Sequence, residues 1–282
     1  MNPPDASLRG GWKPSQLMVR ILSAFVMLAI VLGAVYSGTY GVYALVLLLG
    51  GLALWEFRDL SEKMGSRAPS WLLFPLGAFF AFSGTLLKEV DVTLVLALTL
   101  VGGLAAFLVV PGRRQGLGRW AMGTAGALYI GLPFNYCLLL YTSKPDGLTW
   151  TLFTVFAVVV SDAAALLVGS RIGRHPFFNT ISPHKTVEGA IAGVVGSVVV
   201  MFLGVSGVLG ISPVHAVVLG ILVAACAQSG DLVGSQMKRI AEVKDSGHLI
   251  PGHGGVLDRL DSILFPPILV FFYLTMFHIS GF

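Results

Sequence analysis

Long apolar stretches alternate with short polar segments along almost the whole chain. A helix needs about 20 mainly apolar residues to cross the hydrocarbon core of a bilayer, and nine stretches approach or reach that length. They predict helices at Ile21–Val35, Tyr40–Leu54, Ser70–Leu87, Val92–Val110, Ala121–Tyr141, Thr149–Gly169, Val187–Leu209, Pro213–Gly230 and Asp261–Ile279. The expected fold class is therefore an all-α polytopic membrane protein with about nine transmembrane helices.

The composition supports this class. Of the 282 residues, 55% are hydrophobic and 11% are charged, whereas an ordinary soluble domain has about a quarter of its residues charged. The apolar stretches leave no room for a separate soluble domain. We divide the chain into residues 1–150, a scaffold of about five spans, and residues 151–282, a catalytic region of about four spans with a polar motif at 235–261.

The basic residues test this arrangement, because they should collect on one side of the membrane. Sixteen of the 18 Lys and Arg residues fall before the first stretch or in every second link after it, and the other links hold only Lys88 and Lys144. Positive residues stay on the cytoplasmic side. We expect a multi-pass protein of the inner (cytoplasmic) membrane, with a cytoplasmic N-terminus, an outer C-terminus and residues 235–261 facing the cytoplasm.

The first apolar stretch has two interpretations. A short basic segment followed by Ile21–Val35 is typical of a secretory signal peptide, and it also fits the first span of a polytopic protein. We favour a retained span, because the next apolar stretch follows almost at once at Tyr40–Leu54. The orientation of the later spans is the same in both cases.

The polar segment 235–261 is unlike the rest of the sequence. Asp231 ends the apolar stretch before it, and Ser235, Lys238 and Glu242 follow at helical spacing, so a continuing helix would carry all four on one face. A buried acid, a hydroxyl and a lysine on one stripe suit a metal ion and a phosphate. The alternative is a solvated helix face, but Asp231 lies directly against apolar sequence.

A glycine-rich turn, residues 252–255, precedes Asp258, Arg259 and Asp261. Glycine lets the backbone come close to a ligand, and N–H groups at the start of a helix can bind phosphate. The two acids are three residues apart and would share a helix face. Asp258 could instead serve only as a negative charge at a helix N-terminus, and His253 fits a phosphate donor, a proton carrier or a structural residue.

Asp231 and Asp258 are expected to meet at the cytoplasmic edge, because the segment between them returns the chain to the same side of the membrane. Carboxylates suit Mg²⁺, which takes oxygen ligands and often bridges to substrate phosphates; a second cation is left open. Cations around them would bind a polyphosphate: Lys238, Arg239, Lys244 and Arg259. No Ser-His-Asp set or catalytic cysteine is evident, so the pattern favours direct transfer by positioning, metal and cations.

A second polar segment lies between the sixth and seventh stretches. Ser182 and Pro183 read as the N-cap and first residue of the seventh helix, and Lys185 and Glu188 would lie one turn apart near the membrane edge. A positively charged cytoplasmic loop is the simpler explanation for most of this segment. Asp162 is the exception, because an acid inside an apolar stretch is expected to face a polar cavity.

The 27 residues from Ser235 to Asp261 resemble the C-terminal motif of the phosphatidate cytidylyltransferases, also called CDP-diacylglycerol synthases. That motif reads Ser-x-apolar-Lys-Arg, four residues, Lys-Asp, a small residue, Pro-x-His-Gly-Gly, and then Asp-Arg-apolar-Asp. Its fixed positions are filled here by Ser235, Lys238, Arg239, Lys244, Asp245, Gly247, Pro251, His253, Gly254, Gly255, Asp258, Arg259 and Asp261. Residues 161–162 and 182–189 resemble the family's second conserved region, although His184 stands where the family usually has lysine.

The resemblance implies that CTP and phosphatidic acid react to give CDP-diacylglycerol and pyrophosphate with Mg²⁺, at the surface of a lipid bilayer and without nucleic acid. It also implies a homodimer. Asp231 and Asp258 would be the metal ligands. The candidate catalytic residues are Asp231, Lys238, Arg239, Lys244, Asp245, His253, Asp258, Arg259 and Asp261; the candidate substrate-binding residues are Asp162, Ser182, Lys185, Thr186, Glu188, Ser235, Gly254 and Gly255.

Two other functions fit parts of the pattern. A CTP-dependent polyprenol or lipid kinase would also place a nucleotide site on a bundle of spans, but it would transfer the γ-phosphoryl group. An ion-coupled transporter would explain Asp162, Asp231 and the glycine-rich spans. It predicts inverted repeats and broken helices, which the sequence does not reveal, and it leaves the cytoplasmic cations unexplained.

Overall fold

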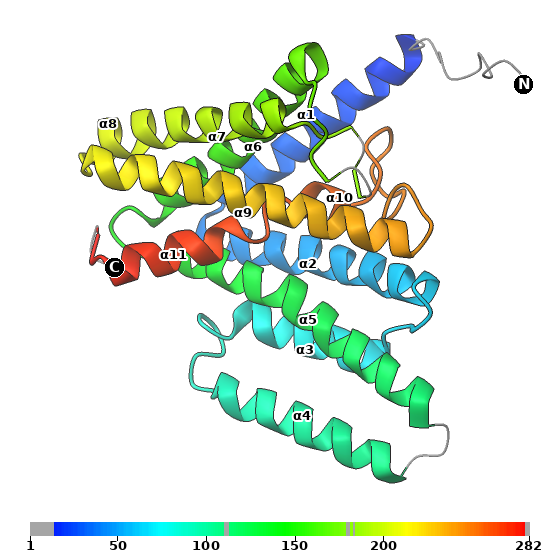
Figure 1. The fold of residues 1–282 in the computed structure, drawn as a ribbon. Helices are drawn as coiled ribbons and strands as arrows, with labels where there is room; N and C mark the ends of the chain where they lie inside the picture. Colours follow the sequence, from blue (N-terminus) through cyan, green and yellow to red (C-terminus); the bar gives the residue numbers. More distant parts are fainter. Residues whose placement is uncertain (1–13, 110–112, 179–180, 183, 280–282) are drawn as a thin grey trace, which may run out of the picture.

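The computed structural model describes residues 14–109, 113–178, 181–182 and 184–279, and in this part of the chain helices are joined by turns (Figure 1). The only extended pairs among these residues are the isolated bridges Pro176–Thr186 and Ile250–Gly254. The all-α prediction is therefore confirmed. The elements are α1 (Pro14–Tyr36), α2 (Gly38–Lys63), α3 (Ser70–Phe82), α4 (Val92–Val109), α5 (Arg113–Thr142), α6 (Gly147–Ile172), α7 (Val187–Met201), the π-helical turn η2 (Phe202–Ser206), α8 (Gly207–Leu209), α9 (Pro213–Ile240), α10 (Leu257–Leu260) and α11 (Pro266–Met276).

Five helices in the described part are long and apolar enough to cross a membrane: α2, α5 from Gly116, α6, the continuous α7–η2–α8 segment and α9. Four more apolar helices are shorter: the Ile21–Tyr36 part of α1, α3, the Val92–Ala105 part of α4, and α11. Each of the nine predicted stretches therefore contains a helix.

Two helices run well past their predicted ends. α2 continues beyond Leu54 to Lys63, and α9 continues beyond Gly230 to Ile240. The apolar runs end earlier because the last turns of both helices carry charged residues. The extension of α9 places Asp231, Ser235 and Lys238 on one helix, as the sequence predicts.

Two other predicted boundaries are wrong. The third helix ends at Phe82 instead of Leu87, because the N–H of Gly84 donates to Oδ1 of Asn135 in α5. The last helix begins at Pro266 instead of Asp261. Proline lacks an N–H group and belongs in the first turn of a helix, so the pair Pro266-Pro267 sets this start. Asp261 therefore lies in the turn before α11.

Two hydrophobic cores hold the bundle together. The first is built from α2, α3 and α5, and it includes Leu257, Leu260 and Leu264 from the end of the polar segment. The second is built from α6, α7, α9 and α11 around the fully buried Trp150. The N-terminal helices thus bury the apolar side of α10 and of the turn that follows it.

Small residues bring α6 and α7 close together. A Cβ atom at Gly189 would lie 2.7 Å from the carbonyl oxygen of Ala165, and one at Gly193 would lie 2.9 Å from the hydroxyl of Ser161. Close backbone approach of this kind is a common way of packing helices in membranes. It seats the start of α7 against α6, beside the polar segment that joins them.

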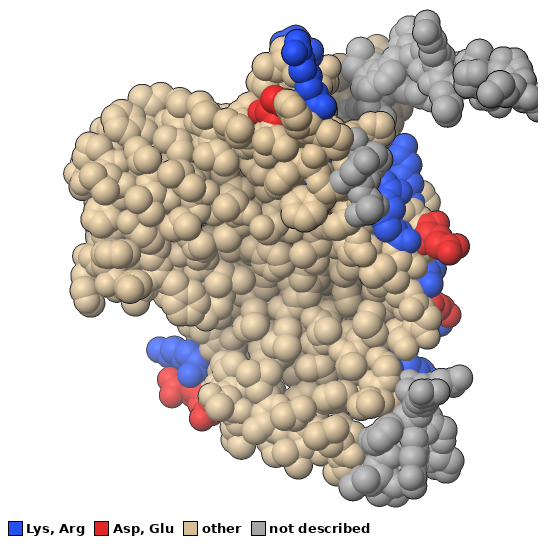
Figure 2. Space-filling view, viewed as in Figure 1, with Lys and Arg blue, Asp and Glu red and all other residues tan. Residues whose placement is uncertain are grey.

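Charged side chains lie at the margins of the molecule. Figure 2 shows an unbroken area of other residues across the middle of this face, with Lys and Arg mainly along the side where α2 and α9 end and a small charged group at the opposite side. The polar segment 241–256 also lies on the side where α9 ends (Figure 1).

Candidate active site

A cavity of about 700 Å³ lies among α6, α7, α9 and α10. Seven candidate residues from the sequence line it: Asp162, Lys185, Thr186, Asp231, Asp258, Arg259 and Asp261. They come from segments that are up to a hundred residues apart in the chain. The fold therefore places Asp231 and Asp258 on the same cavity, and Asp162 faces it from inside α6.

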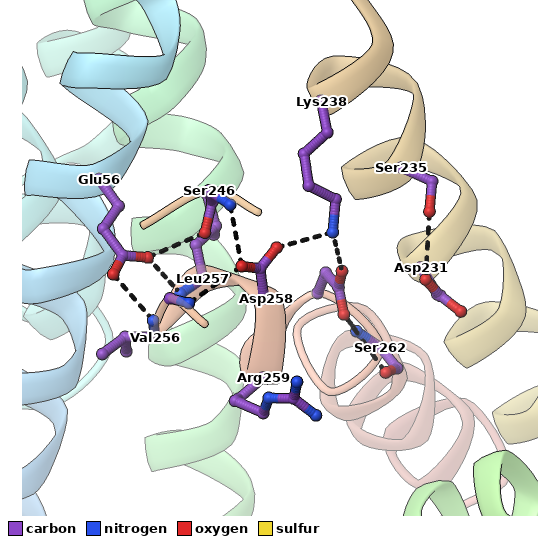
Figure 3. Close-up of polar contacts among 12 residues, drawn as sticks. Glu56, Asp231, Ser235, Lys238, Ser246, Val256, Leu257, Asp258, Arg259 and Ser262 are labelled. Carbon is purple, nitrogen blue, oxygen red and sulfur yellow. Dashed lines mark hydrogen bonds and ion pairs between the residues drawn. The ribbon is translucent and has the colours of Figure 1, made fainter. Parts of the chain in front are cut away.

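Asp231 lies on α9 and pairs with a lysine from the loop before α7. Its Oδ2 is 2.7 Å from Nζ of Lys185. Its Oδ1 accepts a long hydrogen bond of 3.4 Å from the hydroxyl of Ser235 (Figure 3). The Asp231 and Lys185 side chains keep 34% and 26% of their surface exposed. The pair joins α9 to the loop before α7, and both residues line the cavity, although Nζ of Lys185 itself is buried.

Asp258 lies on α10 and is held by three donors. Its Oδ1 accepts from Nζ of Lys238 at 2.7 Å, and its Oδ2 accepts from the N–H groups of Ser246 at 2.8 Å and Gly255 at 3.0 Å (Figure 3). Burial alone would raise the pKa of Asp258, but Lys238 and the two N–H groups outweigh it and hold the pKa below its usual value. Asp258 is thus a fixed carboxylate.

Asp261 is the more deeply buried neighbour of this pair. Its Oδ2 is 3.8 Å from Nζ of Lys238, and its Oδ1 accepts from the N–H of Ser262 at 2.8 Å. Burial raises the pKa of Asp261 to about 7, the charge of Asp231 adds to the rise, and Lys238 opposes it. A carboxyl group with that pKa can exchange a proton near neutral pH.

The donor set suits a hard cation. The polar side chains on the cavity include carboxylates of Asp162, Asp231, Asp258 and Asp261 and the hydroxyl of Ser262, and Mg²⁺ prefers such oxygen ligands. Among the residues described by the structure, no three His, Cys, Asp or Glu side chains form a ready metal cluster. Mg²⁺ usually takes one or two protein carboxylates and completes its coordination with water and substrate phosphates.

A second cavity of about 810 Å³ adjoins the glycine-rich turn. Arg259 lines both cavities, and its Nε and Nη2 donate to the carbonyl of His253 at 3.1 and 2.6 Å. Nδ1 of His253 lies 2.8 Å from the hydroxyl of Ser23 in α1. The other candidate residues on this cavity are Lys244, Asp245 and Gly254. The first helix is thus in direct contact with the motif.

Of the described candidate residues, six line neither cavity: Ser182, Glu188, Ser235, Lys238, Arg239 and Gly255. Lys238 donates a hydrogen bond to Asp258, and Ser235 donates one to Asp231, so both contact acids of the cavity without lining it. Nε of Arg239 donates to the carbonyl of Ile181 at 3.2 Å, which ties the end of α9 to the loop before α7. Glu188 accepts from the N–H groups of Arg174 and His175 and lies 2.6 Å from Nδ1 of His175.

Local geometry corrects two sequence predictions. The N-cap of α7 is Thr186, whose hydroxyl accepts from the N–H of Gly189, instead of Ser182; Pro183 lies outside the described residues. α9 ends at Ile240, and Glu242 follows with a positive φ of 56°, so Glu242 does not share the face of Asp231.

The N–H groups expected to bind phosphate have partners within the turn. The N–H of Gly255 donates to Oδ2 of Asp258, and the N–H of Gly254 donates to the carbonyl of Ile250 at 3.2 Å. Gly254 has a φ of +88°, which favours glycine at this position. The turn shapes the loop around Asp258.

Sequence reasoning missed Glu56, which lies on α2 with only 3% of its surface exposed. Its carboxylate contacts the polar segment 190 to 201 residues away (Figure 3). The available signal was an acid between Trp55 and Phe57 at the end of an apolar run. Its partners could not be read from the sequence.

The comparisons with known proteins all lead to the same family. A profile described as the cytidylyltransferase family matches residues 18–277. The phosphatidate cytidylyltransferase of Bacillus subtilis is 28% identical over 270 residues, which are 93% of this chain and 97% of the relative. The phosphatidate cytidylyltransferase of Staphylococcus saprophyticus is 30% identical over 254 residues, which are 88% of this chain and 95% of the relative. The one from Mycobacterium bovis is 31% identical over 219 residues, which are 76% of this chain and 70% of the relative.

Proposed function

Because this chain belongs to the cytidylyltransferase family, we propose that it is a phosphatidate cytidylyltransferase. It transfers CMP from CTP to phosphatidate and releases pyrophosphate, and the lipid product is CDP-diacylglycerol. The observation that carries the proposal is the cavity that Asp231, Asp258 and Arg259 line together, with each of the two acids paired with a lysine. The cavity lies beside α6 and α9, which are long and apolar enough to cross a membrane.

The reaction is a direct displacement at phosphorus. A phosphate oxygen of the lipid attacks the α-phosphorus of CTP, and the bond from that phosphorus to the bridging oxygen breaks, so its electron pair leaves with pyrophosphate. Positioning and charge stabilisation dominate such a transfer. Lys185 and Arg259 lie on the cavity wall and would contact phosphate oxygens, while Lys238 holds Asp258 in place.

Mg²⁺ would be held by Asp231 and Asp258, and a second cation is left open. When bound, it withdraws negative charge from the phosphates that it contacts. Asp261, whose pKa is raised to about 7, lies next to this set and can exchange a proton near neutral pH.

The cavity wall also suits a lipid substrate. Ala165 and Leu166 of α6 line it together with the charged residues, and Leu166 keeps 71% of its surface exposed on the apolar exterior. The phosphate of the lipid would enter from this side with its acyl chains still among the helices. CTP would enter from the polar side, where the segment 241–256 lies.

The membrane arrangement is part of the proposal. The nine apolar segments expected from the sequence would cross the bilayer, the short helices α3 and α11 together with the turns beside them, with the N-terminus and the cavity on the cytoplasmic side and the C-terminus outside. The distribution of basic residues supports this orientation, since 16 of 18 fall on one side. The contact between Ser23 and His253 supports retention of α1. The family resemblance supports a homodimer, which light scattering from the detergent-solubilised protein would test.

The test uses purified protein in detergent with phosphatidate, Mg²⁺ and CTP labelled on either the α- or the γ-phosphorus, with and without EDTA. We expect α-label in the lipid fraction, γ-label in pyrophosphate, and loss of both with EDTA. Label from the γ-position in the lipid would identify a lipid kinase. No chemical turnover of either labelled CTP would overturn the proposal and leave the transporter to be tested.

A further inference from the structure

Glu56 joins the N-terminal helices to the motif loop. It lies on α2, which continues to Lys63, and 3% of its surface is exposed. Figure 3 shows its side chain pointing from α2 towards the loop that carries Ser246 on one side and Val256 and Leu257 on the other. A buried carboxylate is unfavourable unless hydrogen bonds compensate for the loss of water, so its partners define its role.

Three donors from the motif loop meet this carboxylate. Oε1 accepts from the N–H of Val256 at 2.9 Å, and Oε2 accepts from the N–H of Leu257 at 2.8 Å and from the hydroxyl of Ser246 at 3.0 Å. An ionised carboxylate only accepts hydrogen bonds, and here both oxygens are used. Glu56 therefore clamps the two ends of the turn that contains His253.

Two motif glycines make room for the clamp. A Cβ atom at Gly247 would collide with Oε1 of Glu56, and one at Gly255 would collide with Oε2 of Glu56 and with the hydroxyl of Ser246. Any larger residue at these positions would push the carboxylate away. This gives Gly255 a role other than the substrate contact expected from the sequence.

The clamp continues directly to Asp258. The same Ser246 whose hydroxyl donates to Glu56 donates its N–H to Oδ2 of Asp258 at 2.8 Å, and the N–H of Gly255 donates there at 3.0 Å. Both donors to Oδ2 therefore lie in loop segments that Glu56 fixes to α2. A shift of either segment would move the carboxylate that the cavity presents.

We propose that Glu56 is a positioning residue for cytidylyl transfer: through Ser246 and residues 255–257 it sets the orientation of the Asp258 carboxylate. This inference rests on the function proposed above, in which Asp258 is a metal ligand. Residues that orient a metal ligand typically contribute about 10- to 100-fold to metal affinity or activity. Glu56 does not touch the cavity itself, because it is not among the lining residues in the described part of the chain.

Glu56→Gln is the main test, because it keeps the size of the side chain but puts an NH₂ group where one oxygen accepts. Glu62→Gln is the matched control: Glu62 lies on the same helix, its side chain is 54% exposed and it pairs only with Arg67 among the described residues. We expect Glu56→Gln to lower kcat by about 10- to 100-fold and to raise the Mg²⁺ concentration needed for half-maximal rate. KM for phosphatidate should change little, and Glu62→Gln should behave as wild type.

A readout without turnover separates positioning from folding. The melting temperature of the detergent-solubilised protein is measured with and without Mg²⁺ and CTP. We expect Glu56→Gln to keep a cooperative transition but to lose most of the upward shift that Mg²⁺ and CTP give to wild type. Wild-type kcat and Mg²⁺ dependence in a folded Glu56→Gln protein would overturn the proposal, and so would a loss of activity that only follows the loss of folded protein.

If Glu56→Gln fails to fold, a milder variant still tests whether Glu56 positions Asp258. Ser246→Ala removes one donor and leaves the two N–H donors to Glu56, and we expect a smaller fall in kcat with the same rise in Mg²⁺ requirement. An unchanged Mg²⁺ requirement in Ser246→Ala would count against the clamp. An inactive wild-type protein would instead contradict the proposed function.

Discussion

The two acid–lysine pairs of the cavity differ in how firmly they are held. Asp231 and Lys185 are 34% and 26% exposed, and Asp231 has one further, long hydrogen bond. Asp258 and Lys238 are 6% and 15% exposed, and Asp258 has two further backbone donors. Both pairs join an aspartate to a lysine with the same Nζ–Oδ distance of 2.7 Å, but only the Asp258–Lys238 pair is largely buried.

This difference separates two tasks. A buried ion pair is expensive to break, because removing one partner leaves an unpaired charge in the interior. Asp258 is therefore a fixed point of the site. The Asp231–Lys185 pair is only partly buried, so Lys185 should leave Asp231 for a phosphate at a lower cost than breaking the Asp258–Lys238 pair. The site combines one rigid acid with one that can change partners when substrate binds.

Lys238→Met should have the largest effect, because it leaves Asp258 and Asp261 buried beside no cation. Breaking a buried pair typically costs about 3 to 5 kcal/mol, so we expect a clear fall in melting temperature. Because Lys238 orients Asp258 and lines neither cavity, we expect the rate to fall by about 10- to 100-fold, as for other residues that orient a metal ligand. Thermal unfolding and label transfer measure the two effects, and a variant as stable as wild type would show that this pair is not structurally important.

Lys185→Met should separate activity from stability. We expect a rate loss of about 10²-fold, because the lysine lies on the cavity wall, but a smaller loss of stability than in Lys238→Met, because this pair is less deeply buried. The same two assays apply. A destabilisation equal to that of Lys238→Met would remove the contrast between the pairs.

Ser235→Ala should have a small effect. The hydroxyl makes a 3.4 Å hydrogen bond to Asp231, which is long for an O–H donor. Loss of one such bond contributes about 0.5 to 1.5 kcal/mol at most, so we expect a rate reduced by less than about tenfold. Steady-state kinetics measure it, and a far larger loss would assign the hydroxyl to the substrate.

Lys144→Ala should have no effect on turnover, because Lys144 lies in a link on the proposed outer side. A Lys144→Cys variant in a background without Cys137 and Cys226 should react with an impermeant thiol reagent added to intact cells. Reaction only after the cells are opened would reverse the orientation inferred from charge.

Much of this arrangement could be predicted from local sequence. Apolar stretches locate helices, and spacing along α9 places Asp231, Ser235 and Lys238 on one face. The return of the chain to the same side of the membrane predicted that Asp231 and Asp258 would share a site, and both line one cavity. These features depend on periodicity and chain continuity, which a single sequence carries.

Other features depended on contacts between distant segments. Glu56 lies 190 residues from Ser246, and nothing local marks it as a partner. The seventh helix begins at Val187 as expected, but its N-cap, Thr186, was missed because Ser182-Pro183 has the local signature of a helix start. The pairing of Lys185 with Asp231 on α9 could not be read from that signature. Glu242 was misplaced because its spacing fits a helix that ends at Ile240.

The central claim is that Asp231 and Asp258 serve one Mg²⁺-dependent cytidylyl transfer. The most direct test is the rate of α-label transfer from CTP to phosphatidate by Asp231→Asn and Asp258→Asn, over a range of Mg²⁺ concentrations. Asp146→Asn is the control, because Asp146 makes no side-chain cap to α6. We expect both site variants to extract as folded protein and to lose nearly all transfer, while Asp146→Asn keeps it. Transfer at the wild-type rate and Mg²⁺ dependence by either site variant would contradict the claim.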